Sequence, residues 1–410
     1  MKTRQQLLID KYVAKPIAYL INFLVRIVGK ILSIDHSLDR DFKRIVVCKF
    51  KGLGSIIQAT PMLAALRQKY PHAEIIFVTT QGNVHLLRKI AIIDRVITIN
   101  DKSMWQLLRT LVRTLWTLVR MRPDVYIDLE IYSNFSTLVT LFSLSRNRIG
   151  FYLRSSSFRM GIYTHMMFFN SKVNISEAYL QMARLFGEIP APVTLYPLYE
   201  HIAPEALAIV PPVPYIVINP NASDLRVERR WDAANFALLI QQCVARYPDK
   251  QILLIGGPGE REYTEQVIRS LPDVQVVNMA GKTTMDELIA LIRHAALMIT
   301  NDTGPMHIAF ACQTPTICLF GPCAPEQYGW VNNATVIYKK VYCSPCVHDF
   351  STPPCKGNNT CMQLITVAEV MHVVSGYFDQ AIPLTNPAVA DHTFYEVNQE
   401  VLGLVNRLAL

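Results

Sequence analysis

The chain has 410 residues, of which 51% are hydrophobic, 18% charged and 10% aromatic, and its formal net charge is +8. This composition excludes a disordered chain, a collagen and a small disulfide-bonded scaffold. The length suits two or three domains of roughly 150 residues each. The modest excess of positive charge favours an anionic substrate or an anionic membrane surface over nucleic acid.

The N-terminal segment predicts an amphipathic helix that does not cross a membrane. Residues 17–34 are largely apolar, but Arg26 and Lys30 keep the run below the ~18 residues that span a bilayer. Together with Asn22 they form a narrow polar stripe at helical spacing. The pattern fits a helix lying in a membrane interface with its cations at the headgroups, and equally a helix packed on the protein's own core.

Residues 103–121 predict a second amphipathic helix. Its expected polar side carries Arg109, Arg113 and Arg120, with Trp116 among them. The expected apolar side consists of Leu108, Leu111, Val112, Leu115 and Val119. A basic face with an aromatic residue favours anionic lipid or a phosphorylated glycolipid, and a solvated charged face is the alternative.

The rest of the chain predicts two doubly wound α/β domains that face a cleft. Strands at 44–50, 74–80, 95–99 and 124–129 alternate with helices at 56–69 and 132–144. A proline-rich linker at 190–214 precedes a second alternation, with strands at 215–219, 251–255, 275–277, 297–300 and 316–320. We therefore expect a membrane-associating helix in 1–40, an acceptor-binding domain in 41–200, a nucleotide-sugar-binding domain in 201–370 and a helical tail in 371–410.

Ligands of parallel sheets bind at the carboxyl ends of strands, so the loops that follow the strands contain the candidate residues. One such loop contains Gly52, Gly54 and Ser55, where glycine allows a tight turn and Ser55 can cap the next helix.

The loop at 301–307 predicts a phosphate site. Pro305 suits the first turn of a helix that Asp302 or Thr303 can cap, and free backbone N–H groups at such a helix start bind phosphate. A capped helix without a ligand is the alternative.

Two further loops add candidate donor-binding residues. The glycine-rich loop at 255–260 contains Gly257 and ends in Glu260, a carboxylate able to bind ribose hydroxyls. Arg229 and Arg230 precede Trp231 and offer bidentate phosphate contacts, with a solvated pair as the alternative.

These loops occur in a specific order with other short motifs. The series is Gly52-Leu53-Gly54-Ser55, Ala59-Thr60-Pro61-Met62, Tyr70-Pro71, Arg229-Arg230-Trp231, Gly256-Gly257-Pro258, Gly281-Lys282-Thr283-Thr284, Asn301-Asp302-Thr303-Gly304-Pro305-Met306-His307 and Phe320-Gly321-Pro322. In this order it resembles glycosyltransferase family 9, the bacterial lipopolysaccharide heptosyltransferases.

The resemblance implies a GT-B fold and an inverting, metal-independent transfer of heptose from ADP-heptose, with no further cofactor. The implied acceptor is lipopolysaccharide or another glycolipid, which implies a cytoplasmic protein, peripheral on the inner face of the cytoplasmic membrane. Another donor nucleotide sugar, or a catalytically inactive sugar-nucleotide-binding or assembly protein, remains an alternative. The donor-binding residues that the resemblance implies are Arg229, Arg230, Gly257, Glu260, Lys282, Asp302, Thr303, Gly304, Pro305 and His307.

One position departs from the family's pattern. Ser55 stands where the family has the Asp that is the expected base, and a serine hydroxyl cannot accept a proton at neutral pH unaided. Glu130 follows the strand at 124–129 and is our candidate for the missing base, with Asp128 second. The alternative is that Glu130 is an ordinary polar residue closing a strand.

Nine cysteines, an odd and dilute set, indicate a reducing compartment. Cys343 and Cys346 have metal-ligand spacing, but the intervals to Cys355 and Cys361 do not make a standard zinc site. Similar cysteines occur in relatives of the family, so we expect a local clip whose state stays open between structural zinc, free thiols and a disulfide.

Overall fold

A computed structural model describes residues 3–32, 34–153, 156, 159–188, 194–222, 226–271, 274–330, 332–348, 353, 355 and 357–385. The described residues divide into two compact units. The first contains those up to Ser171 and those of Ser176–Thr194, and the second contains Lys172–Ile175 and those from Leu195 onward.

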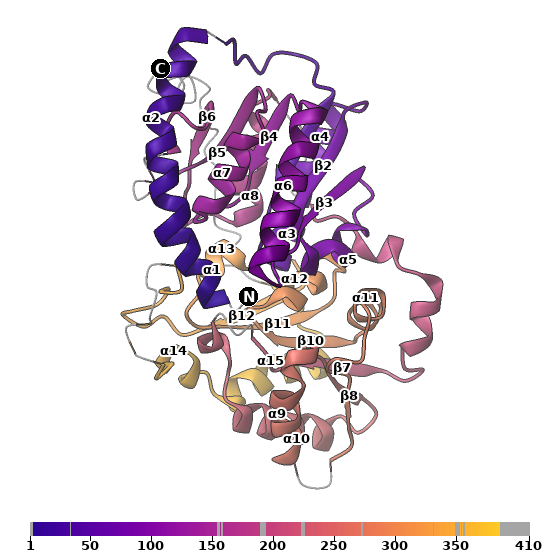
Figure 1. Ribbon diagram of the computed structural model, residues 1–410. Coiled ribbons are helices and arrows are strands. Elements are labelled where there is room, and N and C mark those ends of the chain that lie inside the picture. Colours follow the sequence, from indigo (N-terminus) through magenta and orange to yellow (C-terminus); the bar gives the residue numbers. More distant parts are fainter. Residues whose placement is uncertain are drawn as a thin grey trace. The chain divides into compact units, whose positions relative to one another are not determined.

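The first unit is built on a six-stranded parallel sheet in the order β3-β2-β1-β4-β5-β6 (Figure 1). The strands are β1 (Arg44–Cys48), β2 (Glu74–Thr80), β3 (Arg95–Ile99), β4 (Val125–Asp128), β5 (Asn147–Tyr152) and β6 (His165–Phe168). The helices after the first strand are α3 (Leu53–Gln58), α4 (Thr60–Lys69), α5 (Val84–Leu87), α6 (Met104–Met121), α7 (Asn134–Phe142) and α8 (Ile175–Arg184). The last four residues of β1 are all buried, as expected of a strand covered by helices on both faces.

Pro61 divides one expected helix into two. The pattern at 56–69 predicts a single helix, whereas the structure ends α3 at Gln58 and begins α4 at Thr60. Proline has no N–H to continue the helical hydrogen bonds. The Thr60 hydroxyl donates to the Ile57 carbonyl instead, the acceptor that residue 61 would use in an unbroken helix.

An N-terminal arm packs against the first unit. It consists of α1 (Thr3–Ile9), the π-helical turn η1 (Asp10–Ala14) and α2 (Lys15–Leu32). One carboxylate oxygen of Asp10 accepts a hydrogen bond from the backbone N–H of Phe135, at 2.7 Å, and the other accepts one from the Asn134 side chain, at 2.6 Å. Asp10 therefore satisfies a free donor at the start of α7 from far away in the sequence.

The arm has an inner and an outer face. Ala18 is fully buried in a cluster with Leu141 of α7 and Tyr163, so part of α2 belongs to the core. Asn22, the first residue of the expected polar stripe, is also buried. At Asn22 the structure therefore agrees with the second interpretation, a helix packed on the protein's own core. The side chains of Arg26 and Lys30 lie outside the part of the chain that the structure describes.

Helix α6 confirms its predicted bounds but not its predicted faces. Ser103 caps it, and Leu111, Leu115 and Leu118 pack on the core. Leu108, Val112 and Val119, expected on the buried side, are exposed beside the arginines, because the helix buries only the narrow stripe that contains Thr114 and Leu118.

Gly150 of β5 lets an aromatic ring approach the sheet closely. A Cβ atom at this position would lie 2.5 Å from Cε1 of Tyr163. The Tyr163 hydroxyl in turn donates to Oδ2 of Asp128, at 2.6 Å, so the missing side chain makes room for a buried polar contact.

The second unit repeats the topology of the first. Its parallel sheet has the order β12-β11-β10-β7-β8-β9. If β7 to β12 are numbered 1 to 6 and the sheet is read from β9, the order is 3-2-1-4-5-6, as in the first sheet. The strands are β7 (Tyr215–Asn219), β8 (Gln251–Leu254), β9 (Val276–Asn278), β10 (Leu297–Asn301), β11 (Thr316–Phe320) and β12 (Ala334–Tyr338). The helices are α9 (Ala233–Arg246), α10 (Arg261–Arg269), α11 (Met285–Arg293), α12 (Gly304–Ala311), α13 (Pro325–Tyr328), α14 (Thr360–Gln363) and α15 (Val367–Gln380). The predicted class of two doubly wound α/β domains is confirmed.

Several elements differ from the expectation. Strands β5, β6 and β12 were not expected from the sequence. The expected linker contains two short 3₁₀ helices, Leu198–His201 and Pro204–Ile209. Helix α15 crosses residue 370, where we expected the second domain to end. In the described residues, no helix is both long and apolar enough to span a bilayer.

Replacing Asp10 tests whether the arm stabilises the first unit. Asp10→Ala removes the acceptor at the start of α7, so we expect the free energy of unfolding to fall by about 1 kcal/mol. Chemical denaturation followed by circular dichroism measures it. Asp41→Ala, at an exposed position before β1, is the control. Equal stability of the two variants would contradict this role for Asp10.

Candidate functional site

The start of α12 presents backbone N–H groups at the carboxyl edge of the second sheet. Thr303 occupies the N-cap position and Pro305 the first turn, but no side chain caps the helix. The prediction that Asp302 or Thr303 caps it is therefore wrong. The Thr303 hydroxyl instead accepts from the Asn219 side chain, at 2.8 Å. The N–H groups around Gly304 remain available to an anion.

Arg229 places a positive charge beside this helix start. It follows β7 in the 3₁₀ turn η6 (Val227–Arg229), and its Nη1 lies 3.6 Å from Oδ2 of Asp302. Neither Nε of Arg229 nor Oδ2 of Asp302 has a hydrogen-bond partner, although both are buried. Burial lowers the pKa of Arg229, but Cys323 and Asp302 raise it and the net shift is upward, so the group stays charged. A buried cation with an unused donor suits an incoming phosphate.

Trp231 fixes the segment that contains Arg229. Its backbone N–H donates to Oδ1 of Asn301, at 3.2 Å, and its indole N–H donates to the Ile365 carbonyl, at 2.9 Å. Arg230 donates to the Ala222 carbonyl, at 2.9 Å, and lies over the Tyr263 ring. Arg230 therefore braces the loop, and it is Arg229 that lies at the Asp302 loop.

Two other predicted loops lie at the same edge. Gly257 donates its N–H to Oε2 of Glu260, at 2.7 Å, which closes the turn after β8. Glu260, the residue expected to bind ribose, therefore uses one of its two carboxylate oxygens to close its own loop. Lys282 follows Gly281, which has φ +71°, and its side chain is exposed.

Three asparagines that sequence reasoning missed connect these loops. Asn219 bonds to Thr300 and Thr303, Asn221 bonds to the Ile255 carbonyl, and Asn301 bonds to the carbonyls of Pro220 and Asn221. The sequence contained a signal for them, because Asn219 and Asn301 are the last residues of strands and Asn221 lies two positions after Asn219. A side chain with both a donor and an acceptor can tie neighbouring loops together.

His307 lies in the first turns of α12, buried against Phe310. Burial lowers its pKa to about 4, and Arg229 adds to this lowering while Asp302 opposes it. The imidazole is therefore neutral at physiological pH. The neutral ring can donate one hydrogen bond and accept another beside the start of α12 without adding a charge there.

The carboxyl edge of the first sheet contains the Gly52 loop. Gly52 has φ +88° and is the N-cap of α3, while Gly54 is buried in its first turn. Ser55 lies inside α3, so the prediction that it caps this helix is wrong. Its hydroxyl is a hydrogen-bond partner of the buried Tyr179.

Glu130 lies against this loop. Its Oε1 accepts from the backbone N–H groups of Phe50, at 2.7 Å, and Lys51, at 3.0 Å, and its Oε2 accepts from Nζ of Lys49, at 2.9 Å. Burial raises the pKa of Glu130, but Lys49 and the two N–H groups together lower it by more than burial raises it. The net shift of the pKa is therefore downward. An ionised carboxylate offers about four acceptor sites, so one on Oε2 remains.

Asp128, the second candidate for the base, is enclosed. Its side chain is fully buried, with Oδ2 bonded to Tyr163 and Oδ1 to the backbone N–H of Glu130, at 2.9 Å. Burial raises its pKa, against the lowering by Arg159. Asp128 is thus more deeply buried than Glu130 and less accessible to an acceptor, and it stays the second candidate.

No disulfide joins the four clustered cysteines in the described part of the chain. Cys346 donates its backbone N–H to the Pro322 carbonyl, at 2.9 Å, which attaches their loop to the end of β11. Burial, and to a smaller extent Cys346, Cys343 and Cys355, raise the pKa of Cys361 to about 11. Within the described ranges, no set of three or more His, Cys, Asp or Glu side chains is arranged to hold a metal ion.

We predict that acid destabilises the second unit through His307. In the unfolded chain the His307 imidazole is protonated below about pH 6.5, whereas in the folded state it is protonated only below about pH 4. The stability contribution is present above this window and lost as the pH falls through it, by about 2 kcal/mol at pH ~5. Denaturant unfolding followed by tryptophan fluorescence at neutral and acid pH measures the loss.

His307→Gln should remove that share of the pH dependence. His165 of the first unit, whose pKa burial also lowers to about 4, contributes to the dependence that remains in both proteins. An unchanged pH dependence in His307→Gln would contradict the buried, neutral state of the imidazole.

Comparison with known proteins matches this chain to one family. A model described as glycosyltransferase family 9 (heptosyltransferase) matches residues 115–356, more than half of the chain. Lipooligosaccharide heptosyltransferase 2 of Campylobacter jejuni is 32% identical over 162 residues, which cover 38% of this chain and 49% of that protein. The chain thus spans about half the length of this relative. Lipopolysaccharide heptosyltransferase 3 of Escherichia coli is 26% identical over 288 residues, covering 68% and 82%.

Solved structures share the fold. The structure of Escherichia coli ADP-heptose lipopolysaccharide heptosyltransferase II superimposes with a TM-score of 0.66 and 20% identity, covering 83% of this chain and 99% of that one. A family 9 glycosyl transferase from Veillonella parvula gives a TM-score of 0.69 at 20% identity, covering 84% and 100%. With the match over residues 115–356, the chain belongs to glycosyltransferase family 9, the heptosyltransferases.

Proposed function

We propose that this protein transfers a heptose, with inversion, from ADP-heptose to a lipopolysaccharide or other glycolipid acceptor. Family membership and the heptosyltransferase relatives support the reaction class, and the name of one solved neighbour supports the donor. The observation that carries the proposal is the uncapped start of α12 beside Arg229, whose Nε has no partner. This is a site for a diphosphate.

The donor diphosphate binds at this helix start in our proposal. The N–H groups of α12 and the guanidinium of Arg229 meet its negative charge, so no metal ion is required. Their attraction increases as the bond from the sugar to the β-phosphate breaks and charge develops on ADP. Gly257, Glu260 and Lys282 are at the same sheet edge and are proposed to bind the nucleoside part.

We propose Glu130 as the base. In an inverting transfer, the acceptor hydroxyl attacks the anomeric carbon while ADP leaves, and its proton must go to a neighbouring group. Glu130 is ionised at neutral pH and keeps one acceptor site on Oε2, beside the Lys49 ammonium. Lys49 contributes to its lowered pKa, which makes Glu130 a weak base but keeps it ionised and ready to accept the proton.

The acceptor determines where the reaction takes place. A glycolipid keeps its acyl chains in a bilayer, so we propose that the protein works as a cytoplasmic, peripheral protein on the inner face of the cytoplasmic membrane. Ser55 at the family's Asp position favours a second candidate, a catalytically inactive sugar-nucleotide-binding protein. ADP release from ADP-heptose with truncated lipopolysaccharide tests the reaction. Tight donor binding without turnover would support the second candidate, and preference for another nucleotide sugar would overturn the donor.

Arg229→Ala tests the donor site. Loss of a charge-assisted contact should weaken ADP binding by about 1.5 to 3 kcal/mol, measured by titration calorimetry. Arg269→Ala, an exposed position on α10, lowers the net charge equally and should leave the affinity unchanged. Unchanged affinity in a folded Arg229→Ala protein would remove this residue from the site.

Glu130→Gln tests the base. The Gln oxygen can still accept from Phe50 and Lys51, while the basicity and the ion pair with Lys49 are lost. We expect kcat to fall roughly a hundredfold, with ADP affinity nearly unchanged. Because the pKa of Glu130 is lowered, the base stays ionised as the pH falls toward 4.5, and kcat/KM of the wild type should be flat from neutral pH to about pH 5.

Two results would contradict this role. An acid limb of kcat/KM near pH ~6.5 would assign the proton transfer to another group. Full activity in Glu130→Gln would leave the residue a purely structural contact, and a rate gained in Ser55→Asp would then show that the chain lacks its family's optimal base.

A further inference from the structure

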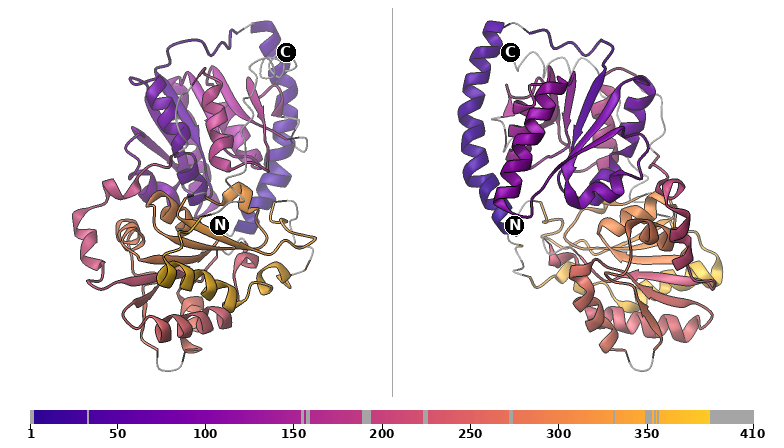
Figure 2. Two further views of the ribbon diagram at one scale, coloured as in Figure 1. Left: turned by 180° about the vertical axis from the view of Figure 1, so that it is seen from behind. Right: turned by 45° about the vertical axis from the view of Figure 1, so that its right-hand side comes forward.

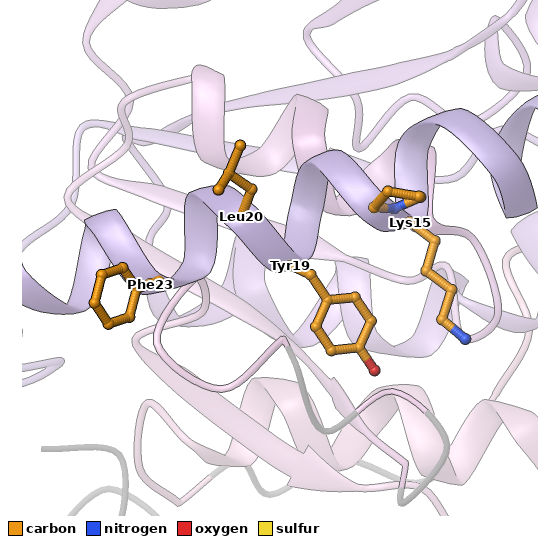
Figure 3. A pocket seen from close by; sticks show the side chains of 5 residues that line it. Lys15, Tyr19, Leu20 and Phe23 are labelled. Carbon is orange, nitrogen blue, oxygen red and sulfur yellow. The ribbon is translucent and has the colours of Figure 1, made fainter.

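The outer face of α2 is broadly apolar and exposed. Leu20, Phe23 and Ile31 are 69%, 66% and 74% exposed, and Leu24 and Ile27 are exposed with them. Figure 3 shows Tyr19, Leu20 and Phe23 projecting from the helix beside Lys15, along a hollow that these residues line. The segment Lys15–Leu32 contains no Asp or Glu. Helix α2 therefore buries one stripe and exposes large apolar side chains on another.

Helix α6 exposes aromatic and basic side chains together. Trp105 and Trp116 are 74% and 58% exposed. The guanidinium of Arg120 lies 3.9 Å from the centre of the Trp116 ring, and Arg109 and Arg113 are exposed on the same helix. Met104–Met121 also contains no acidic residue. Tryptophan and arginine are the side chains suited to the boundary between lipid and water.

The two helices lie on one side of the first unit. Both pack against α7, α2 through Ala18 against Leu141 and α6 through the cluster that includes Phe135. They flank α7 in Figure 1, and the right-hand view of Figure 2 shows them next to each other. Their exposed side chains lie on the same side of the first unit, and together we call them the α2–α6 surface. It consists of the exposed residues Tyr19, Leu20, Phe23, Leu24, Ile27, Ile31, Trp105, Leu108, Arg109, Val112, Arg113, Trp116 and Arg120.

We propose that the α2–α6 surface docks on an anionic lipid bilayer. Its apolar side chains enter the acyl boundary, and its arginines meet the lipid phosphates. The absence of Asp and Glu from both helices matches a negatively charged partner, and it would bring like charges together in a second copy of this chain.

The arm also determines which end of the surface lies near the Gly52 loop. Asp10, just before α2, binds the start of α7, and Gln6 donates to Asp101, which follows β3, at 3.0 Å. Both contacts lie at the carboxyl edge of the sheet, so the surface begins beside that edge. Docking at this edge would bring the sugar end of a glycolipid to the Gly52 loop. This part of the inference rests on the proposed function, whereas the docking on lipid does not.

Sedimentation with vesicles tests the proposal on the full chain. The wild type should bind vesicles of phosphatidylcholine with phosphatidylglycerol, and added salt should weaken the binding. Leu20→Glu with Phe23→Glu should weaken it more than about tenfold. Arg113→Gln should weaken it roughly fivefold, and only for the anionic vesicles. Leu238→Glu on α9, at a position 45% exposed in the second unit, is the matched control.

Activity on a deacylated, soluble acceptor separates docking from the reaction. The docking variants should keep the wild-type rate on it, and this rate and ADP binding also verify that they fold. Equal vesicle binding by the Leu20→Glu, Phe23→Glu variant would overturn the proposal. A second result would also overturn it: the wild type does not bind vesicles but forms a dimer, and the double variant is a monomer. The surface would then join two copies of the chain. Vesicle binding without turnover on any acceptor would overturn the proposed function alone.

Discussion

All neighbouring strands of each sheet are parallel, so every strand of a sheet delivers its following loop to the same edge. That constraint explains why residues as distant as Lys49 and Glu130, or Trp231 and Asn301, meet through hydrogen bonds. It also explains why central strands such as β1 and β7 are apolar along most of their length, since helices cover both faces and leave the edge as the place for polar chemistry. The two units use the same topology and differ in what occupies that edge.

In the first unit, the protein's own carboxylates occupy the backbone donors. Asp10 binds the N–H at the start of α7, and Glu130 binds those of Phe50 and Lys51. In the second unit, the comparable donors at the start of α12 have no side-chain cap, and the neighbouring guanidinium keeps an unused N–H. The first edge is thus electrostatically satisfied from within, while the second still has positive potential for an anion. The difference supports a division of labour in which the second unit binds the charged donor.

The sequence predicted the fold class and most of the long strands, because a parallel sheet buried on both faces gives continuous apolar runs such as residues 75–78 of β2. It did not predict β5, whose Asn147, Arg148 and Gly150 break such a run, because Gly150 depends on Tyr163 from another segment. The candidate loops were found through glycine and proline. The buried state of Asp128 and the inward position of Asn22 depend on tertiary packing, to which a local pattern is blind.

The contact between Gly150 and Tyr163 has an evolutionary consequence. A methyl group at position 150 would meet the ring, and moving the ring would take from the buried carboxylate of Asp128 the shorter of its hydroxyl contacts, that from Tyr163. Neither position can drift alone. Among homologues, a side chain at position 150 should therefore appear together with a smaller residue at position 163, and both together with a neutral residue at position 128. The three positions constitute one inherited unit, although only one of them would be chosen as important from its chemistry.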